Sequence, residues 1–408
     1  MVRQGLIKEV QEIFRSFGFV PIDTPALEYT EVLLGKGGGE TDKQMFRFND
    51  NGGRDVALRF DLTVPLARYV AANYSSLSFP FKRYHINKVW RGEKPQKGRF
   101  REFMQCDFDI IGADNAASDF EILLLIHTCL KKMNIGAFKV LVSHRGLLNR
   151  FLAQHGIDSK CDAVLRAVDK LDKIGEEEVC SILKEEGLSD SDISSVMEYI
   201  KLPKNSFEET LGILTKQFGS DTPEIIRLNE IFALMKECNI QDDFVIDTSI
   251  TRGLDYYTGI VYETTLLNLP SIGSICSGGR YNNLAGLYTK ENLPGVGSCI
   301  GLDRLIAALE ETDSPIVKQA RYADLMIVSD ANNPLWQERT AAIFRAKGIK
   351  TDCYLGSKGL GQQFAYAESN SIPYVICGQD SNGFKLKEIA TRQVFEGLTP
   401  EEIISKIR

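Results

Sequence analysis

Apolar and polar side chains alternate most regularly between Trp90 and Gly112, in the segment WRGEKPQKGRFREFMQCDFDIIG. Because successive side chains of a β-strand point to opposite faces, this alternation predicts two strands joined by a basic loop. One face of the second strand is largely apolar and is expected to pack against a core: Phe100, Met104, Cys106, Phe108 and Ile110. The other face carries charged, amide and aromatic side chains: Arg99, Arg101, Phe103, Gln105, Asp107 and Asp109. We therefore expect a strand with one face for packing and one face for chemistry.

A helical period marks the N-terminal segment. Leu6, Val10, Ile13 and Phe17 recur every three or four residues and are followed by Gly18. This spacing places apolar side chains on one side of an α-helix, and glycine commonly follows a helix end. We predict an amphipathic helix that ends near Gly18.

A β-hairpin is predicted next, where MFRFND and DVALRF flank the turn formed by Asn51, Gly52 and Gly53. The segment RFDLTVPLAR follows, with Asp61 and Thr63 two positions apart. They could bind a ligand, or one of them could simply cap the helix through Arg68. Spacing alone leaves both interpretations open.

The middle of the chain changes character between Gly156 and Ile240. Short helical patterns there carry 18 acidic and 10 basic residues, which predicts a helical insertion without a strong phosphate clamp. Strand patterns return in FVIDTSI, TRGLDYYTGIVYETTLL and SIGSICSGGRYNNL. The segment PGVGSCIGLDRLIAALEE then predicts a strand that runs into a helix. A boundary is expected between Asp313 and Gln319, because strand and helix patterns alternate beyond it as in a small α/β domain.

Composition narrows the class of protein. The chain has 408 residues, of which 43% are hydrophobic and 25% charged, as in a globular protein of two or three domains. It has no apolar run of about 18 residues, and its N-terminus is charged and amphipathic, so we expect a soluble cytoplasmic protein. Its nine cysteines are scattered and it has only four histidines, which argues against structural zinc and a disulfide framework.

The formal net charge of −7 gives no general attraction for nucleic acid. RNA binding would therefore depend on local patches. One such patch lies between Lys82 and Glu102, where eight Lys or Arg residues accompany two Glu residues.

The polar face of the second strand predicts a binding site. Arginines bind phosphates through two parallel hydrogen bonds, an aromatic ring stacks on a base, and an amide with a carboxylate can hold an ammonium group. The row therefore suits a nucleotide bound beside a small zwitterion. The alternative is an antiparallel strand with a charged outer face, and periodicity alone does not decide between them.

Two further segments carry candidate ligand-binding residues. RGLDYYTG groups Arg252, Asp255, Tyr256 and Tyr257 around two glycines, either as a functional loop or as a tyrosine-rich hairpin corner. Arg304 lies in the first turn of the helix after PGVGSCIG, off its apolar stripe, a position that favours contact with a triphosphate. The nearby glycines miss the GxGxxG spacing and no GxxxxGK[ST] occurs, which excludes Rossmann and P-loop sites.

Taken together, these segments resemble the histidyl-tRNA synthetase family of class II aminoacyl-tRNA synthetases. WRGEKPQKGRFREFMQCDFDIIG is similar to its motif 2, RGLDYYTGIVYE to its histidine-specific signature, and GLDRL to its motif 3. Gly18 to Pro25 resembles motif 1, whose last proline belongs at the dimer interface in this family. The resemblance covers nearly the whole chain, and RGLDYYTG together with SGGRY is its most specific part.

The resemblance implies an α+β fold: an antiparallel six- or seven-stranded class II catalytic sheet with helices and a helical insertion, plus a C-terminal α/β anticodon-binding domain. The implied domains are a catalytic domain over residues 1–155, the insertion over 156–240, the rest of the catalytic domain over 241–313, and the anticodon-binding domain over 320–408. It further implies a homodimer that activates L-histidine with ATP and transfers it to histidine tRNA. Mg²⁺ is expected with the ATP, although no dedicated set of metal ligands is visible.

The resemblance also implies site residues. The expected histidine-binding residues are Asp61, Leu62, Thr63, Arg91, Gln105, Asp109, Arg252, Tyr256 and Tyr257. The expected ATP-binding residues are Arg91, Glu93, Arg99, Phe103 and Arg304. Within these sets, Arg91 and Arg252 are the expected catalytic cations at the α-phosphate and the amino-acid carboxylate, Phe103 stacks under adenine, and Asp109 with Tyr257 bonds the imidazole.

One alternative function stays open from this resemblance. A non-ligating paralogue, similar to the regulatory subunit of ATP phosphoribosyltransferase, keeps the catalytic fold as a histidine sensor. That paralogue typically lacks the anticodon domain and parts of the RGLDYYTG signature, and both are present here. The sequence therefore favours the ligase.

Overall fold

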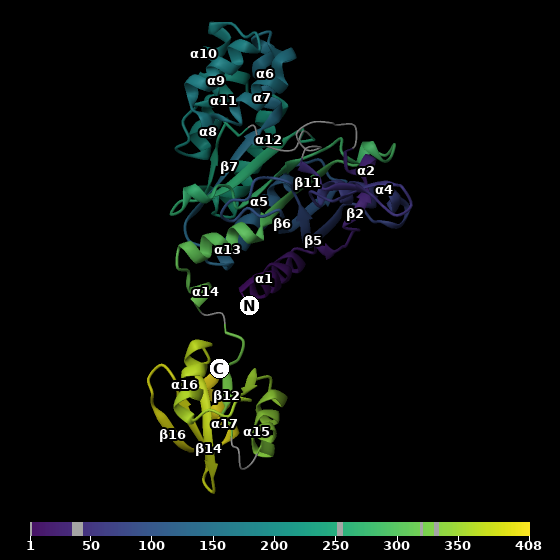
Figure 1. Ribbon diagram of the computed structural model, residues 1–408. Coiled ribbons are helices and arrows are strands. Elements are labelled where there is room, and N and C mark those ends of the chain that lie inside the picture. The colour runs from purple at the N-terminus through teal and green to yellow at the C-terminus, as the bar shows by residue number, and fades with distance from the viewer. Residues whose placement is uncertain (1, 35–43, 251–255, 319–320, 330–333) are drawn as a thin grey trace. The chain divides into compact units, whose positions relative to one another are not determined.

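The computed structural model describes residues 2–34, 44–250, 256–318, 321–329 and 334–408. The chain forms two compact units, Leu6–Thr312 and Asp313–Arg408, the latter together with Met1–Gly5 (Figure 1). The larger unit contains the residues predicted to bind histidine and ATP. In the described parts of the chain, no helix combines the length and the apolar character needed to cross a membrane.

A mixed sheet forms the centre of the larger unit. In the described residues it has eight strands in the order β1-β5-β6-β11-β10-β9-β7-β8. Their bounds are β1 Val20–Pro21, β5 Phe81–Trp90, β6 Glu102–Ile111, β7 Phe138–His144, β8 Phe244–Ile246, β9 Ile260–Leu266, β10 Cys276–Arg280 and β11 Gly295–Gly301. The inner six strands pair antiparallel, whereas β1 and β8 join the two edges in parallel.

The α+β class is confirmed, but the expected six or seven antiparallel strands are corrected to eight with two parallel pairings. The two additional strands are only two and three residues long. The sequence pattern indicated a strand at FVIDTSI, which contains β8, whereas the two-residue β1 carries no readable alternation, and the parallel pairing of both strands is visible only in the tertiary structure.

The predicted packing face of β6 is confirmed at its buried positions. Cys106, Phe108 and Ile110 are at most 1% exposed. The ring of Phe14 packs 4.9 Å from that of Phe108, and Phe14 belongs to helix α1 (Val2–Ser16). Phe100, which we assigned to the same face, precedes the strand and is 52% exposed. The core contact therefore begins only where β6 is flanked by β5 and β11.

The predicted hairpin is confirmed in a second, three-stranded sheet of order β2-β4-β3. The bounds are β2 Leu27–Tyr29, β3 Arg47–Asn49 and β4 Asp55–Leu58, with helices α2 Thr30–Leu34 and α4 Thr63–Ala72 beside them. The turn closes through a hydrogen bond from Gly53 N to Asp50 O, and Gly53 has the positive φ that glycine readily adopts. Strand β4 thereby delivers Asp61 to the start of α4.

Helices cover the sheet and form the segment between β7 and β8. Their bounds are α5 Ala116–Lys132, α6 Arg145–Gln154, α7 Cys161–Val168, α8 Leu171–Ile174, α9 Glu176–Glu185, α10 Asp190–Ile200, α11 Phe207–Phe218, α12 Pro223–Glu237 and α13 Leu302–Glu311. Figure 1 shows α6 to α11 gathered together at one end of the larger unit. Helix α5 contacts β6, β11 and α12, so it links this helical group to the sheet.

The smaller unit contains a five-stranded sheet of order β13-β12-β14-β15-β16. Its elements are α14 Pro315–Lys318, β12 Leu325–Ile327, α15 Pro334–Ala346, β13 Thr351–Cys353, α16 Leu360–Ser369, β14 Tyr374–Asp380, β15 Gly383–Glu388, β16 Val394–Leu398 and α17 Pro400–Ile407. The first three strands pair in parallel, as expected of alternating strands and helices. Thr399 and Glu402 form a capping box at the start of α17.

Candidate active site

The face of β6 opposite its packing face forms the floor of the candidate site. On β5, the residues opposite Asp109, Asp107 and Gln105 are Arg83, His85 and Asn87. Directly opposed residues of neighbouring strands point to the same face of a sheet. On the other side, β11 places Gly297, Cys299 and Gly301 opposite the same three residues. Three strands therefore build one polar surface, most of which is buried.

Asp61 lies at one side of this surface and has two partners. Its Oδ1 accepts a hydrogen bond from Val64 N (3.1 Å) in the first turn of helix α4, although the N-cap position itself is Leu62. Its Oδ2 accepts one from the hydroxyl of Tyr256 (3.3 Å). Burial raises the pKa of Asp61 to about 6, and the hydrogen bond from Val64 N and nearby Arg91 oppose that rise. A contact with the helix and a contact with the pocket are thus compatible, because one oxygen of Asp61 bonds to the first turn of α4 while the other faces Tyr256.

Asp109 is held from three sides. Nη2 of Arg83 lies 2.7 Å from its Oδ2, and the hydroxyl of Tyr281 donates a hydrogen bond to its Oδ1. Burial raises the pKa of Asp109, while Arg83 and the Tyr281 hydroxyl act against that rise. A Cβ atom on Gly297 would lie only 1.9 Å from Oδ1, so only glycine leaves room for this carboxylate. The orientation of Asp109 is therefore determined by its neighbours on β5 and β11 and by Tyr281.

Asp107 and Gln105 complete the buried floor. Burial raises the pKa of Asp107 to about 7, Arg83 lowers it, and Asp109 raises it further. Oδ1 of Asp107 and Oε1 of Gln105 have no hydrogen-bond partner among the described residues. Burial raises the pKa of the Tyr257 hydroxyl, and the charges of Asp109, Asp107 and Asp61 raise it further, so this hydroxyl lies in the same negative field. Unpartnered buried acceptors of this kind are suited to donors on a ligand.

A group of cations lies at the other end of the strand pair. Arg91 donates from Nε to Phe60 O (2.9 Å), and its guanidinium lies 5.2 Å from the ring centre of Phe103. Burial lowers the pKa of Arg304 to about 10, and the positive charges of Arg99 and Arg91 lower it further. These arginines are therefore close enough to repel one another, an arrangement that an anionic ligand would relieve.

The basic loop reaches Arg304 because Gly98 packs directly against helix α13. A Cβ on Gly98 would lie 3.3 Å from Cα of Arg304, and Gly98 has positive φ. Arg99 and Glu93 of this loop form an ion pair at 3.7 Å. At the start of α13, Asp303 accepts a hydrogen bond from Met104 N (2.7 Å), which fixes the helix to β6.

The structure brings two sets of predicted residues together. Around the buried carboxylates lie Asp61, Thr63, Gln105, Asp109, Tyr256 and Tyr257. Around Arg304 lie Arg91, Glu93 and Arg99, with Phe103 beneath Arg91. The side chain of Leu62 is buried, and its carbonyl oxygen accepts from Arg83. Arg252 lies outside the described residues.

Sequence reasoning did not assign Arg83, Tyr281 or Glu263 to the site, and it placed Asp107 on the polar face without assigning it to a ligand. Arg83 and Asp107 could have been found from one signal in the sequence. The strand before the basic loop also alternates, and Arg83 lies on the same face of it as His85, the residue opposite Asp107. Tyr281 directly follows β10 and Glu263 lies in β9, and only the strand order places them here.

No group of three or more His, Cys, Asp or Glu residues suited to a metal ion occurs in the described part of the chain. Glu93 and Glu263 both raise the pKa of Arg304, so two carboxylates lie near the cation group. One or two carboxylates are what Mg²⁺ commonly uses when phosphates supply its other ligands.

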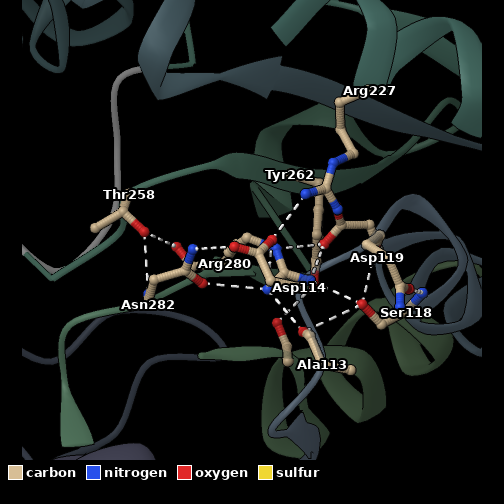
Figure 2. A network of polar contacts seen from close by, with 11 residues as sticks. Ala113, Asp114, Ser118, Asp119, Arg227, Thr258, Tyr262, Arg280 and Asn282 are labelled. Carbon is tan, nitrogen blue, oxygen red and sulfur yellow. Dashed lines mark hydrogen bonds and ion pairs between the residues drawn. The ribbon is translucent and has the colours of Figure 1, made fainter. Parts of the chain in front are cut away.

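A separate ion-pair network anchors the SGGRY segment behind the site (Figure 2). Arg280 donates to Asp119 from Nε (2.8 Å), and Arg227 of α12 lies 3.2 Å from the same carboxylate. Asn282 donates from Nδ2 to Asp114 (2.8 Å), and its backbone N–H donates to Thr258 Oγ1 (3.0 Å). The network joins β10 to the start of α5 and to the helical segment.

A family model described as histidyl-tRNA synthetase matches residues 2–305. The histidine–tRNA ligase of Treponema denticola is 49% identical over 425 aligned positions, which cover 100% of this chain and 94% of that protein. The histidine–tRNA ligase of Rhodopirellula baltica is 42% identical, covering 100% of this chain and 95% of that protein.

Solved structures give the same comparison in three dimensions. The crystal structure of histidyl-tRNA synthetase from Nostoc superposes with a TM-score of 0.86 at 30% identity, covering 99% of this chain and 94% of that one. A structure described as an ATP phosphoribosyltransferase regulatory subunit/histidyl-tRNA synthetase from Bacillus halodurans has a TM-score of 0.75 at 22% identity, covering 93% and 95%. At that identity the second match shows a shared fold alone.

Proposed function

Because the chain belongs to the histidyl-tRNA synthetase family, we propose that the polar face of its central sheet binds L-histidine beside ATP and forms histidyl-adenylate. The chain is an aminoacyl-tRNA synthetase, an ATP-dependent ligase that joins histidine to tRNA. One observation carries the residue assignment: Arg91, Arg99 and Arg304 gather next to a floor of buried carboxylates. A triphosphate and a zwitterion with a basic side chain match that pairing of charges.

The histidine subsite is assigned to the buried carboxylates and tyrosines. Asp61, with Thr63 and Gln105, would hold the α-ammonium group, while Asp109 and Tyr257 would bond the imidazole. Support for this comes from the unpartnered Gln105 Oε1 and from the fixed orientation of Asp109. A site built to bond imidazole N–H groups can reject analogues that lack them by roughly 10⁴ to 10⁵.

The ATP subsite is assigned to the cation group. Arg304 would bind the outer phosphates, Arg99 and Glu93 would complete the loop around the nucleotide, and Phe103 would stack under adenine. Glu93 and Glu263 would hold Mg²⁺ together with the phosphates, and the ion would neutralise part of their charge.

The chemistry needs positioning more than proton transfer. A carboxylate oxygen of histidine bonds to the α-phosphorus, the bond to the bridging oxygen of the β-phosphate breaks, and pyrophosphate leaves with the electron pair. The nucleophile is already ionised, so no general base is required. Arg91 and Arg252 would stabilise the negative charge on the α-phosphate and align the carboxylate. A hydroxyl at the 3′ end of the tRNA then attacks the acyl carbon and AMP leaves.

We further propose that the chain acts as a homodimer in the cytoplasm. Motif 1 and the small sheet expose apolar side chains, with Val20 and Phe48 each 47% exposed, Leu27 43% and Tyr29 40%. Burying such side chains against a second copy would be favourable. Val20 lies in motif 1, where the family's dimer contact is expected, and Leu27, Tyr29 and Phe48 lie in the small sheet that follows it in the sequence.

The domain assignment is part of the same proposal. Residues 1–155 and 241–313 form the catalytic domain, 156–240 the helical insertion, and 320–408 the unit that binds the anticodon of histidine tRNA. A histidine-sensing regulatory subunit is not favoured, because the ligases from Treponema denticola and Rhodopirellula baltica align over the whole chain.

Amino-acid-dependent ATP–pyrophosphate exchange with each of the twenty amino acids tests the proposal. We expect exchange with histidine only. Exchange with none of them would remove the ligase assignment, and exchange with another amino acid would remove the assigned specificity.

A further inference from the structure

Arg83 is a fully buried arginine in the floor of the candidate site. Its side chain is 0% exposed, and Nη2 lies 2.7 Å from Oδ2 of Asp109. The same nitrogen donates to the carbonyl oxygen of Leu62 (3.3 Å). Its Nε and Nη1 have no hydrogen-bond partner among the described residues. A buried guanidinium with two free nitrogens is costly, so a stabilising interaction must retain it there.

That interaction is with the carboxylates around it. Asp61, Asp107 and Asp109 are all at most 2% exposed, and the charge of Arg83 favours the ionised form of each. The cross-strand register places Arg83 opposite Asp109, next to the pair formed by His85 and Asp107. Without a cation here, the carboxylates would repel one another in a region with little water, and one would take up a proton.

The ionisation of Asp109 matters because of what it would bind. An ionised carboxylate accepts a hydrogen bond from an imidazole N–H, whereas a protonated one presents a competing O–H donor. Tyr281 already donates to Oδ1, so rotation of Asp109 is limited from that side. Arg83 is the cation that contacts Oδ2.

We propose that Arg83 is a positioning residue for histidine selection, which holds the Asp109 carboxylate ionised and in place for an imidazole and offsets the charge of Asp107. The inference rests on the proposed role of Asp109 as an imidazole ligand. Arg83 acts through Asp109 and contacts no substrate itself.

The first test is the kinetics of ATP–pyrophosphate exchange with Arg83→Met and Arg83→Lys. Methionine has similar length without charge, and lysine keeps the charge without the planar fork. We expect Arg83→Met to raise the KM for histidine by at least about tenfold while the KM for ATP changes less than about twofold. Arg83→Lys should recover part of the loss. Equal increases in both KM values would overturn the proposal.

A double-mutant cycle with Asp107→Asn tests the charge offset. Removing Asp107 together with Arg83 removes one anion along with the cation, so Asp109 can remain ionised more easily. We expect the KM for histidine of Arg83→Met/Asp107→Asn to be several-fold lower than that of Arg83→Met. If the fold-change in the KM for histidine of the double variant equals the product of the two single fold-changes, Arg83 does not balance the charge of Asp107 and that part of the proposal fails. If Arg83→Met does not fold, Arg83→Gln, which is also uncharged, replaces it in both the single and the double variant of this cycle.

Arg280→Met is the matched control. Arg280 also lies 2.7 Å from a buried aspartate, Asp119, and both side chains are almost as buried as those of Arg83 and Asp109. We expect Arg280→Met to lower the melting temperature but to leave the KM for histidine within about twofold of the parent. An equal rise in that KM would show general loosening and contradict the proposal.

Asp109→Asn distinguishes the proposed role of Asp109 as an imidazole ligand from the proposed role of Arg83 in positioning it. If it leaves the KM for histidine unchanged, the proposed imidazole ligand is wrong. If it raises that KM and Arg83→Met does not, the role of Asp109 stands and that of Arg83 fails.

Discussion

The hydroxyl of Tyr256 donates a hydrogen bond to Oδ2 of Asp61 across a separation of 195 residues. The other carboxylate oxygen of Asp61 accepts a hydrogen bond from Val64 N in the first turn of helix α4. The loop that contains the tyrosine pair is thereby joined to the end of the hairpin segment. Loss of the carboxylate would affect both helix and pocket, whereas loss of the hydroxyl affects only the pocket.

Tyr256→Phe should therefore raise the KM for histidine with little effect on stability. One hydrogen bond is worth about 1 kcal/mol, which corresponds to roughly a fivefold change. Exchange kinetics with varied histidine measure it. Tyr374→Phe is the control, since it loses a comparable bond to Lys406 O within the smaller unit. An unchanged KM for histidine in Tyr256→Phe would argue against a pocket role for this hydroxyl.

Gly297→Ala should displace Asp109. The added Cβ would lie 1.9 Å from Oδ1 of Asp109 and 2.9 Å from Phe108 O, so the carboxylate must move. We expect about 2 to 3 kcal/mol of destabilisation and a large rise in the KM for histidine. Chemical denaturation and exchange kinetics measure these effects. Gly286→Ala serves as the control, because its Cβ would meet no atom within 4 Å. Retention of normal histidine binding in Gly297→Ala would refute the proposed placement of Asp109.

Arg304→Met should affect ATP rather than histidine. The guanidinium donates to Ser274 O and lies among other positive charges, an arrangement suited to phosphates. We expect the KM for ATP to rise by at least about tenfold, with the KM for histidine nearly unchanged. Arg150→Met, which removes an exposed ion pair with Glu224, controls for the loss of one positive charge. A rise in the KM for histidine alone would show that the assignment of Arg304 to the ATP subsite is wrong.

Asp107→Asn should change how stability depends on pH. Folding raises the pKa of Asp107 from 3.8 to about 7, chiefly through burial. Between these values the folded state keeps a proton that the unfolded state loses, so the free energy of unfolding falls as pH rises. Asparagine does not titrate, so the variant does not lose free energy of unfolding at this position as the pH rises. The melting temperature of Asp107→Asn relative to the parent should rise from about pH 4 to about pH 8, and a constant difference would contradict the pKa assignment.

Removal of residues 315–408 should separate the two steps of the reaction. All described residues assigned to histidine and ATP lie in the unit Leu6–Thr312. We expect the shortened chain to retain ATP–pyrophosphate exchange and to charge tRNA at least about tenfold more slowly. Charging at the parent rate would contradict the proposed anticodon contact. Loss of exchange in a chain that still unfolds cooperatively would show that the domain assignment is misplaced.

Local patterns were readable because their causes are local. The alternation from Phe103 to Ile110 specifies a strand with two distinct faces, and the Asn51–Gly53 turn specifies the hairpin beside it. The family resemblance added residues such as Asp61, Arg91 and Arg304 through motifs that are themselves short stretches of chain. For the same reason, sequence alone indicated that Asp61 could cap a helix or bind a ligand but could not decide between them.

Partners between strands were decided only by the tertiary structure. Whether Arg83 faces Asp109, and whether Gly297 makes room for that carboxylate, depends on the register of three strands that are far apart in the sequence. The short parallel strands at the sheet edges depend on the same long-range pairing. By itself, the sequence determined the strands, the faces and the chemical groups available. Folding determined which of those groups share a buried volume, and burial together with proximity is what shifts their pKa values and suits them to a ligand.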